Sequence, residues 1–105
     1  MVQIKITSKA KKDIASIYKF ILNDSSQNAE KVVGSIIKKI DTLQKQPDFG
    51  KIVKEFNKKS IRELKLYKYR IIYRVKSPSL VEIITVQHSA RLLANNPNVK
   101  RYFKK

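Results

Sequence analysis

Apolar residues recur along the first half of the chain with two different periods. Residues 2–6 alternate between apolar and polar side chains, which is typical of a half-buried strand. Apolar positions then step by four, three and four between residues 9 and 23, and a similar stretch covers residues 29–43. The polar residues 23–28 separate the two helical stretches, so the pattern predicts an antiparallel helix hairpin after an N-terminal strand.

Single residues predict how these helices begin, end and pack. Thr7 or Ser8 has the right side chain to cap the first helix, and Pro47 with Gly50 ends the second one. Gly34 lies inside the second helix, where it lowers the helix propensity. We interpret Gly34 as a mark of close approach between the two helices.

The second half of the chain predicts three consecutive strands. Residues 61–66 alternate weakly, whereas residues 69–76 and 80–87 are rich in β-branched and aromatic side chains. Residues 51–60 show no period, and we expect them to form a connecting loop. Consecutive strands joined by short turns form an antiparallel meander. The predicted fold is therefore α+β, with an N-terminal strand, a helix hairpin, and a three-stranded meander whose one face carries the helices.

Length and composition fit one small domain. The chain has 105 residues, of which 42% are hydrophobic, and this suits a single modest core. We expect residues 1–93 to form the domain and residues 94–105 to form a basic C-terminal tail. No apolar stretch with a cleavage site follows the first residues, and no apolar run approaches a membrane span. We therefore expect a cytoplasmic protein that does not contact a membrane.

The net charge points to an acidic or polyanionic partner. Lys and Arg number 24 against 8 Asp and Glu, which gives a formal net charge of +16. Such an excess creates a positive field that favours nucleic acid, an acidic protein or an anionic surface. Because most of these cations are lysines, a solvated surface without a specific partner is the alternative.

Arginines occur among the apolar residues of the strongest predicted strand. Alternation along residues 69–76 places Arg70 and Arg74 on the face opposite to the core. We interpret this as an open sheet face with a cationic row, which Arg62 joins if the strand register allows. Guanidinium groups bind carboxylates and phosphates bidentately, so these residues are candidate target- or phosphate-binding groups.

Two further observations bear on this cationic site. Arg91, just after the last predicted strand, is a fourth candidate for binding the target or a phosphate. The structural alternative is that the arginines form cross-strand ion pairs with carboxylates such as Glu63 or Glu82.

His88 is the only histidine in the chain and lies at the end of the last predicted strand. Strand alternation puts it on the same face as Glu82, Ile84 and Val86. An imidazole is suited to proton transfer near neutral pH, so His88 is a catalytic candidate. The alternative is a structural histidine that ties down the chain after the sheet.

The residue inventory gives no reason to expect a metal or a cofactor. No second histidine, no cysteine and no clear carboxylate cluster accompanies His88 as a metal ligand set. The two glycines, Gly34 and Gly50, do not make a phosphate-binding loop.

Four segments, taken in order, resemble the RelE/ParE superfamily of bacterial toxins, the stable halves of type II toxin–antitoxin pairs. They are residues 8–21 and 29–51, then 61–75 with the sequence IRELKLYKYRIIYRV, and 81–93 with the sequence VEIITVQHSARLL. The resemblance covers nearly the whole chain except its last dozen residues. It implies the same small α+β fold that the hydrophobic pattern predicts.

The resemblance implies one of two actions. RelE-like members cut mRNA in the ribosome with basic residues on the sheet and at its C-terminal end, whereas ParE-like members act on DNA gyrase and lack that catalytic set. Arg70 matches the usual sheet arginine of RelE-like toxins, and His88 lies where some of these nucleases place a catalytic residue. The chain runs on to Tyr102 and beyond, which departs from the short Arg-containing ending of RelE-like toxins. The ending H-x-x-R is more similar to ParE-like and plasmid-stabilisation proteins.

We therefore predict a growth-inhibiting toxin with a ParE-like action on DNA gyrase, neutralised by a cognate antitoxin whose toxin-binding segment is acidic. The alternatives are a RelE-like, ribosome-dependent mRNA endoribonuclease, with His88 as its catalytic residue, and a non-toxic basic nucleic-acid-binding module. Whether the protein is an enzyme depends on this choice. Operator DNA is expected to be reached only through the antitoxin complex, and a homodimer is left open.

Overall fold

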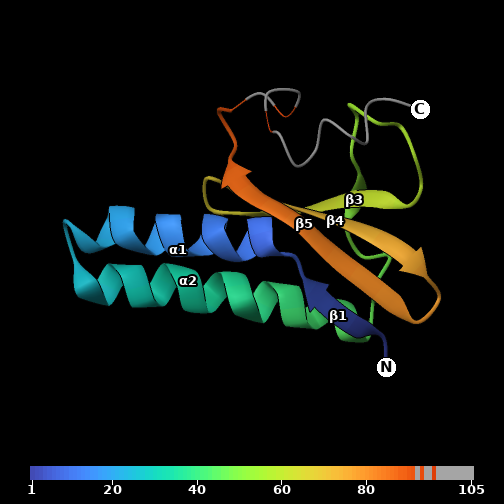
Figure 1. Cartoon of the computed structure of the whole chain (residues 1–105), viewed down its shortest axis with the longest axis horizontal. Coiled ribbons are helices and arrows are strands. Elements are labelled where there is room, and N and C mark those ends of the chain that lie inside the picture. Colours follow the sequence, from blue (N-terminus) through green and yellow to red (C-terminus); the bar gives the residue numbers. More distant parts are fainter. Residues whose placement is uncertain (92, 94–95, 97–105) are drawn as a thin grey trace.

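The chain forms a five-stranded sheet with a pair of helices on one face (Figure 1). The computed structural model describes residues 1–91, 93 and 96. The elements follow in the order β1 (Gln3–Ile6), α1 (Ser8–Leu22), α2 (Ser26–Asp41), the short 3₁₀ helix η1 (Thr42–Gln44), β2 (Lys51–Ile52), β3 (Ile61–Leu66), β4 (Tyr69–Ser77) and β5 (Leu80–His88). Neither α1 nor α2 is long and apolar enough to cross a membrane.

The sheet is mixed rather than purely antiparallel. Its strand order is β1-β5-β4-β3-β2, and β1 pairs parallel to β5, with Gln3 opposite Leu80 and Ile6 opposite Ile83. The other pairs are antiparallel. The α+β class, the helix hairpin after the first strand and the meander of β3, β4 and β5 are confirmed. The place of β1 beside the last strand was not predicted, because alternation identifies a strand but not its neighbour.

Thr7 joins the start of α1 to the sheet. Its hydroxyl oxygen accepts a hydrogen bond from the Ala10 amide at 3.2 Å, which caps the helix. The same hydroxyl donates to the Ile83 carbonyl of β5 at 2.8 Å. The Thr7 side chain thus ties the first turn of α1 to β5, together with the Thr7 amide, which donates to the same carbonyl at 3.2 Å.

The main core lies between the helices and the sheet. It contains the following buried residues: Ala10, Ile36, Ile40, Leu43, Leu64, Ile71, Tyr73, Val81, Ile83 and Val86. Tyr73 is fully buried, and its hydroxyl donates to the Pro47 carbonyl at 2.8 Å while accepting from the Gly50 amide at 2.9 Å. Burial of the hydroxyl also raises the pKa of Tyr73. Tyr73 therefore holds the loop after η1 against the centre of the sheet.

The opposite sheet face carries a second, smaller apolar cluster, so the expectation of a fully open face is wrong. Val53, Ile61, Ile72, Ile84 and Leu93 are buried there, with Phe56 packed beside them. The segment 51–60, expected to be only a connecting loop, supplies β2 and the buried Val53. Its apolar residues cover Ile72 without any regular period, which is why their role was not visible in the sequence.

The two glycines have opposite environments. A Cβ atom added to Gly34 would meet nothing within 4 Å, so the expected close helix approach at this residue is wrong. A Cβ atom at Gly50 would lie 2.6 Å from the Glu63 carbonyl oxygen and 2.6 Å from the Tyr73 hydroxyl. Gly50 is therefore required by close packing, whereas Gly34 is not.

We predict opposite effects for the same substitution at these two positions. Gly34→Ala should raise the free energy of unfolding by about 1 kcal/mol, because alanine has the higher helix propensity. Gly50→Ala should lower it by about 1–3 kcal/mol, because the backbone must shift to admit the methyl group. Urea unfolding of both variants beside the parent measures this, and shifts of the same sign would contradict the assignment.

Candidate functional site

A bulge in β5 decides which side chains face the helices at the end of the sheet. Ile72 of β4 pairs with Thr85 and Tyr73 pairs with Ile83, so Ile84 is an extra residue on β5. Before the bulge, Glu82 lies opposite Arg74 on the face away from the helices. After it, Val86 lies opposite Ile71 and His88 opposite Tyr69, on the side of the main core.

The expected common face of Glu82, Ile84, Val86 and His88 is therefore wrong. An inserted residue reverses the alternation, and nothing in the local sequence marks the insertion. The consequence is that His88 belongs to the helix side of the sheet and not to the face that carries Arg70 and Arg74.

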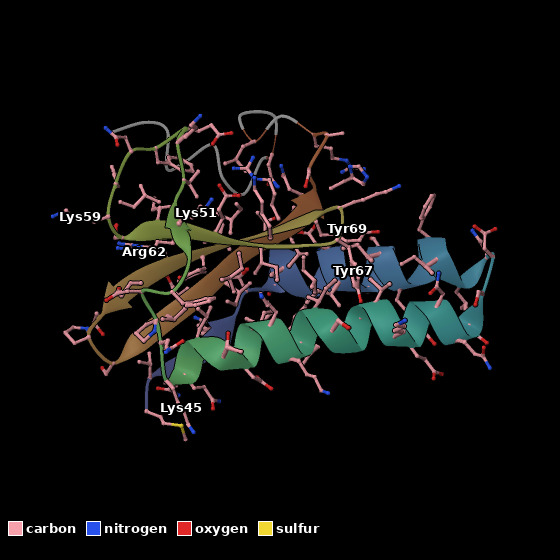
Figure 2. The ribbon with its side chains drawn as sticks, turned by 180° about the vertical axis from the view of Figure 1, so that it is seen from behind. Lys45, Lys51, Lys59, Arg62, Tyr67 and Tyr69 are labelled. Atoms are coloured by element: carbon pink, nitrogen blue, oxygen red, sulfur yellow. The ribbon has the colours of Figure 1, made fainter. Side chains whose placement is uncertain are left out.

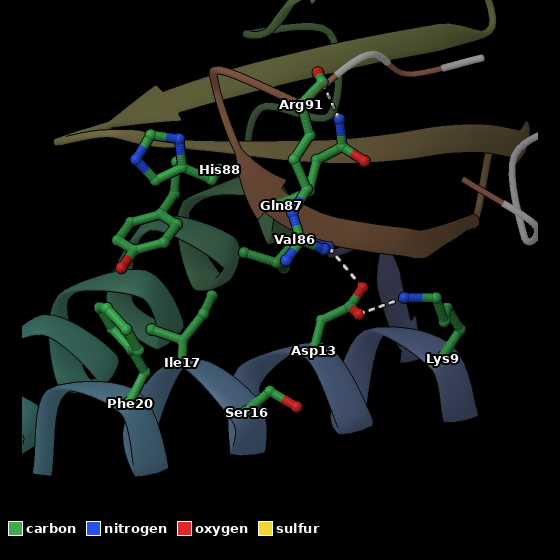
Figure 3. Close-up of a pocket in the computed structure, with 10 residues that line it drawn as sticks. Lys9, Asp13, Ser16, Ile17, Phe20, Val86, Gln87, His88 and Arg91 are labelled. Atoms are coloured by element: carbon green, nitrogen blue, oxygen red, sulfur yellow. Dashed lines mark hydrogen bonds and ion pairs between the residues drawn. The ribbon is translucent and has the colours of Figure 1, made fainter. Parts of the chain in front are cut away.

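A cavity of about 570 Å³ opens between α1 and the end of β5 (Figure 3). It is lined by Lys9, Asp13, Ser16, Ile17 and Phe20 from α1, and by Tyr69, Val86, Gln87, His88 and Arg91 from the sheet and the turn after it. His88 and Arg91 thus lie in one cavity, while Arg62, Arg70 and Arg74 are not part of it.

Asp13 connects α1 to the bulged strand. Its carboxylate accepts a hydrogen bond from the Val86 amide at 3.1 Å and pairs with Lys9 one turn earlier (Figure 3). It also accepts a hydrogen bond from the Thr85 hydroxyl. The side chain of Asp13 is only 12% exposed. Sequence reasoning missed this residue. The available signal was an acidic residue beside the apolar positions of a helix.

Asn96 continues this polar network beyond β5. Its side-chain amide donates to the Thr85 hydroxyl at 3.0 Å and to the Gln87 side-chain oxygen at 2.8 Å. Gln87 in turn donates to the Arg91 carbonyl at 3.3 Å. Asn96 is buried, although it belongs to the predicted tail of residues 94–105. The other residues of that tail lie outside the described part of the chain.

His88 forms hydrogen bonds that organise the turn after β5. Its Nδ1 accepts from the Ala90 amide at 3.0 Å, and its carbonyl accepts from the Arg91 amide at 3.1 Å. The exposed imidazole meets the Tyr69 ring edge-on, with 5.9 Å between ring centroids. This geometry matches the structural alternative for His88 and leaves Nε2 as the nitrogen that can face a ligand.

Arg70 lies between two carboxylates. Its guanidinium donates to Glu63 at 2.7 and 3.2 Å, and to Glu55 at 3.2 Å through each of two nitrogens. Its side chain is only 12% exposed. The guanidinium is therefore not the exposed group that a cationic row requires, and the Arg–Glu pairing considered from the sequence is present.

The hydrogen bonds between Arg70 and the two carboxylates shift pKa values at this position. The hydrogen bond from Arg70 lowers the pKa of Glu55 from its usual value of 4.5, against the opposing effect of burial. The hydrogen bonds to Glu63, followed by those to Glu55, raise the pKa of Arg70 still further above its usual range. Glu55 lies in the segment that covers the second apolar cluster, so the ion pairs fasten this segment to β4.

The remaining predicted arginines differ in their surroundings. Arg62 lies opposite Tyr73 on the helix side of the sheet and donates to the carbonyls of Asp48, Gly50 and Lys59. Arg74 is 38% exposed and approaches Glu82 at 3.9 Å. Arg91 is exposed beside the cavity. The structure therefore does not bring the four arginines together into one row.

Within the described part of the chain, no three His, Cys, Asp or Glu side chains gather closely enough to hold a metal ion.

Comparisons with known proteins place these features in a family. Residues 4–93 match the model of the ParE toxin of the type II toxin–antitoxin system parDE. No curated protein sequence is significantly similar to the chain. The fold is similar to a chain of the chromosomal ParDE toxin–antitoxin system from P. aeruginosa, with 24% identity, a TM-score of 0.69, and coverage of 84% of this chain and 96% of that one.

A second solved structure with a similar fold is the toxin–antitoxin complex RelBE2 from Mycobacterium tuberculosis. Here the identity is 18% and the TM-score is 0.59, with coverage of 83% of this chain and 96% of that one.

We predict that Arg70 and Arg74 differ in their contribution to stability. Arg70→Gln should lower the free energy of unfolding by roughly 2 kcal/mol, because it leaves two partly buried carboxylates without their partner. Arg74→Gln should change it by no more than about 0.5 kcal/mol, because the Arg74 side chain is 38% exposed and its distance to Glu82, 3.9 Å, is long for an ion pair. Urea unfolding measures both. Equal changes in the free energy of unfolding would show that the Arg70 ion pairs contribute no more stability than the Arg74 ion pair.

Acid should weaken the attachment of the segment that carries Glu55. Because its pKa is lower in the folded than in the unfolded state, Glu55 contributes stability above its usual pKa, and this is lost as the pH falls through the folded-state value. We predict that Glu55→Gln is less stable than the parent at about pH 7 and that the difference shrinks at about pH 3. A difference that stays constant with pH would contradict this coupling.

Proposed function

We propose that this protein, which belongs to the ParE toxin family of type II toxin–antitoxin systems, inhibits bacterial growth by acting on DNA gyrase and is neutralised by an antitoxin. The family membership supports the toxin role. The geometry of the sheet bears on the choice between a gyrase inhibitor and a ribosome-dependent nuclease.

The observation that carries the choice is the compensation of Arg70 by Glu55 and Glu63. A nuclease must place cationic groups where charge develops on the scissile phosphate, and such groups act through a site that is already organised for the transition state. Here two carboxylates occupy the guanidinium from both sides, so a phosphate would have to displace them against like-charge repulsion. This supports a toxin that acts by binding a protein rather than by cutting RNA.

The position of His88 supports the same choice. General acid–base catalysis needs a group within hydrogen-bond reach of the reacting atoms. Other groups of the same site must hold the substrate in place beside it. The bulge in β5 places His88 on the helix side of the sheet, whereas Arg70 faces the other side. This separation supports the view that His88 and Arg70 do not act together on one phosphate.

Arg74 and Arg91 remain our candidates for contact with the target, because both side chains reach solvent. Arg62 and Arg70 are assigned structural roles, since their guanidinium groups hold neighbouring loops. With a net charge of +16, the protein should associate faster with an acidic partner at low salt. The same argument applies to the antitoxin, whose toxin-binding segment we propose to be acidic.

We predict that the purified protein inhibits DNA supercoiling by gyrase and leaves mRNA intact in a translation extract.

His88→Gln should retain most of the growth inhibition, because glutamine can still accept the Ala90 amide hydrogen bond. An acid–base role is worth about 10²–10⁴-fold in rate, so the two assignments differ widely in expected effect. Induction of the parent and of His88→Gln in growing cells, followed by colony counts, measures the growth inhibition by each.

Circular dichroism of His88→Gln serves as the control for folding. Loss of growth inhibition by two orders of magnitude in a folded variant, together with mRNA cleavage by the parent, would replace the gyrase assignment by the nuclease. A purified protein that inhibits neither supercoiling nor translation would contradict both proposed actions.

A further inference from the structure

The turn between β3 and β4 contains an aromatic residue in a backbone conformation that aromatic residues rarely adopt. Leu66 pairs with Tyr69, so Tyr67 and Lys68 form a two-residue hairpin turn. Tyr67 has a φ of 54°, and Lys68 is not among the positive-φ residues. Positive φ at the first turn position alone is the pattern of a type II′ turn, which favours glycine there because a Cβ atom is strained.

Within the described part of the chain, a backbone hydrogen bond fixes this turn, whereas the Tyr67 side chain makes no hydrogen bond. The Ser89 amide, just after β5, donates to the Lys68 carbonyl at 2.7 Å and so fixes the turn against the neighbouring strand. The Tyr67 side chain itself is 59% exposed. Among the described residues its hydroxyl makes no hydrogen bond and its ring no aromatic contact. Strain of this kind is typical of positions retained for function.

Tyr67 stands beside other exposed aromatic surface. Tyr67 and Tyr69 lie together at the turn end of the hairpin (Figure 2), and Tyr69 lines the cavity together with Phe20 of α1. Phe20 is 73% exposed, although it lies in a helix whose other face is packed. We name this surface the aromatic corner and define it by Phe20, Tyr67, Tyr69 and His88.

The chemistry of the corner fits a protein segment. Its floor is aliphatic, because Ile17 and Val86 line the cavity below the rings. Exposed tyrosine and phenylalanine over such a floor are typical of anchors in protein interfaces. Arg91 lines the cavity, and the exposed Lys19 and Lys68 are the sequence neighbours of Phe20 and Tyr67. The one carboxylate in the cavity wall, Asp13, is already bound to Lys9 and β5.

We infer that the aromatic corner is a docking site for an acidic, amphipathic segment of the antitoxin, with Tyr67 as the anchor residue. Apolar side chains of that segment enter the cavity over Ile17 and Val86, and its carboxylates face the three cations. This inference rests on the proposed antitoxin partner and adds the site. It also gives the strained turn a reason, since the Tyr67 ring and hydroxyl, which have no aromatic or hydrogen-bond partner among the described residues, gain contacts in the complex.

Titration calorimetry of the toxin with its purified antitoxin tests the inference. Tyr67→Gly removes both the ring and the strain. We expect it to unfold at a higher temperature than the parent and to bind the antitoxin at least about tenfold more weakly. Phe20→Ala, on the opposite wall, should also weaken binding and leave the thermal transition nearly unchanged, because its ring is exposed. Tyr67→Phe should bind close to the parent affinity.

Asn57→Gly is the matched control, because Asn57 is the other non-glycine residue with positive φ in the described chain and lies outside the corner. It should bind like the parent. Full affinity in Tyr67→Gly, or a lower unfolding temperature, would overturn the inference while the toxin–antitoxin pairing stands. A parent that binds no antitoxin would overturn the proposed partner as well. Binding of a single-stranded DNA probe that depends on Tyr67 would assign the corner to nucleic acid instead.

Discussion

The carboxylate of Asp13 is the interaction on which the arrangement of the functional face depends. It stabilises the bulge in β5 from the helix side by accepting from the Val86 amide and the Thr85 hydroxyl. The bulge then reverses the alternation of β5, which turns His88 toward Tyr69 and Glu82 toward Arg74. A charged group so little exposed is stable only with its partners, and Lys9 supplies the opposite charge. One helix residue thus determines which strand residues face the cavity.

The charge of the protein has two separate parts. Among the residues that the structure describes, five of the eight carboxylates form ion pairs, namely Asp13, Asp48, Glu55, Glu63 and Glu82. They therefore neutralise some of the cations that lie on or near the sheet, including Arg70. The remaining excess of lysine lies largely on the surface, where it produces a long-range field that accelerates encounters but carries little specificity. Specific recognition must then come from shaped surfaces such as the aromatic corner.

Local periodicity predicted the elements of this fold well, because each helix and strand buries one regular face. The core face of β4, with Ile71 and Tyr73, follows directly from alternation. The parallel pairing of β1 and the bulge at Ile84 were not predictable, since both are settled by contacts distant in sequence. For the same reason, the candidate site was predicted less well than the helices and strands. Arg70 was recognised as a special residue, but its partner Glu55 comes from a segment without any period.

The pairing of β1 with β5 also has a consequence for the synthesis of the toxin. Gln3 meets Leu80 and Ile6 meets Ile83, so β1 finds its partner only after β5 has left the ribosome. Contacts of such large sequence separation give a high contact order, and they form late in folding. The helix hairpin can assemble early, but the sheet closes only after β5 has been made. Until then a nascent chain also lacks Val86, Gln87 and His88, which form the strand side of the cavity.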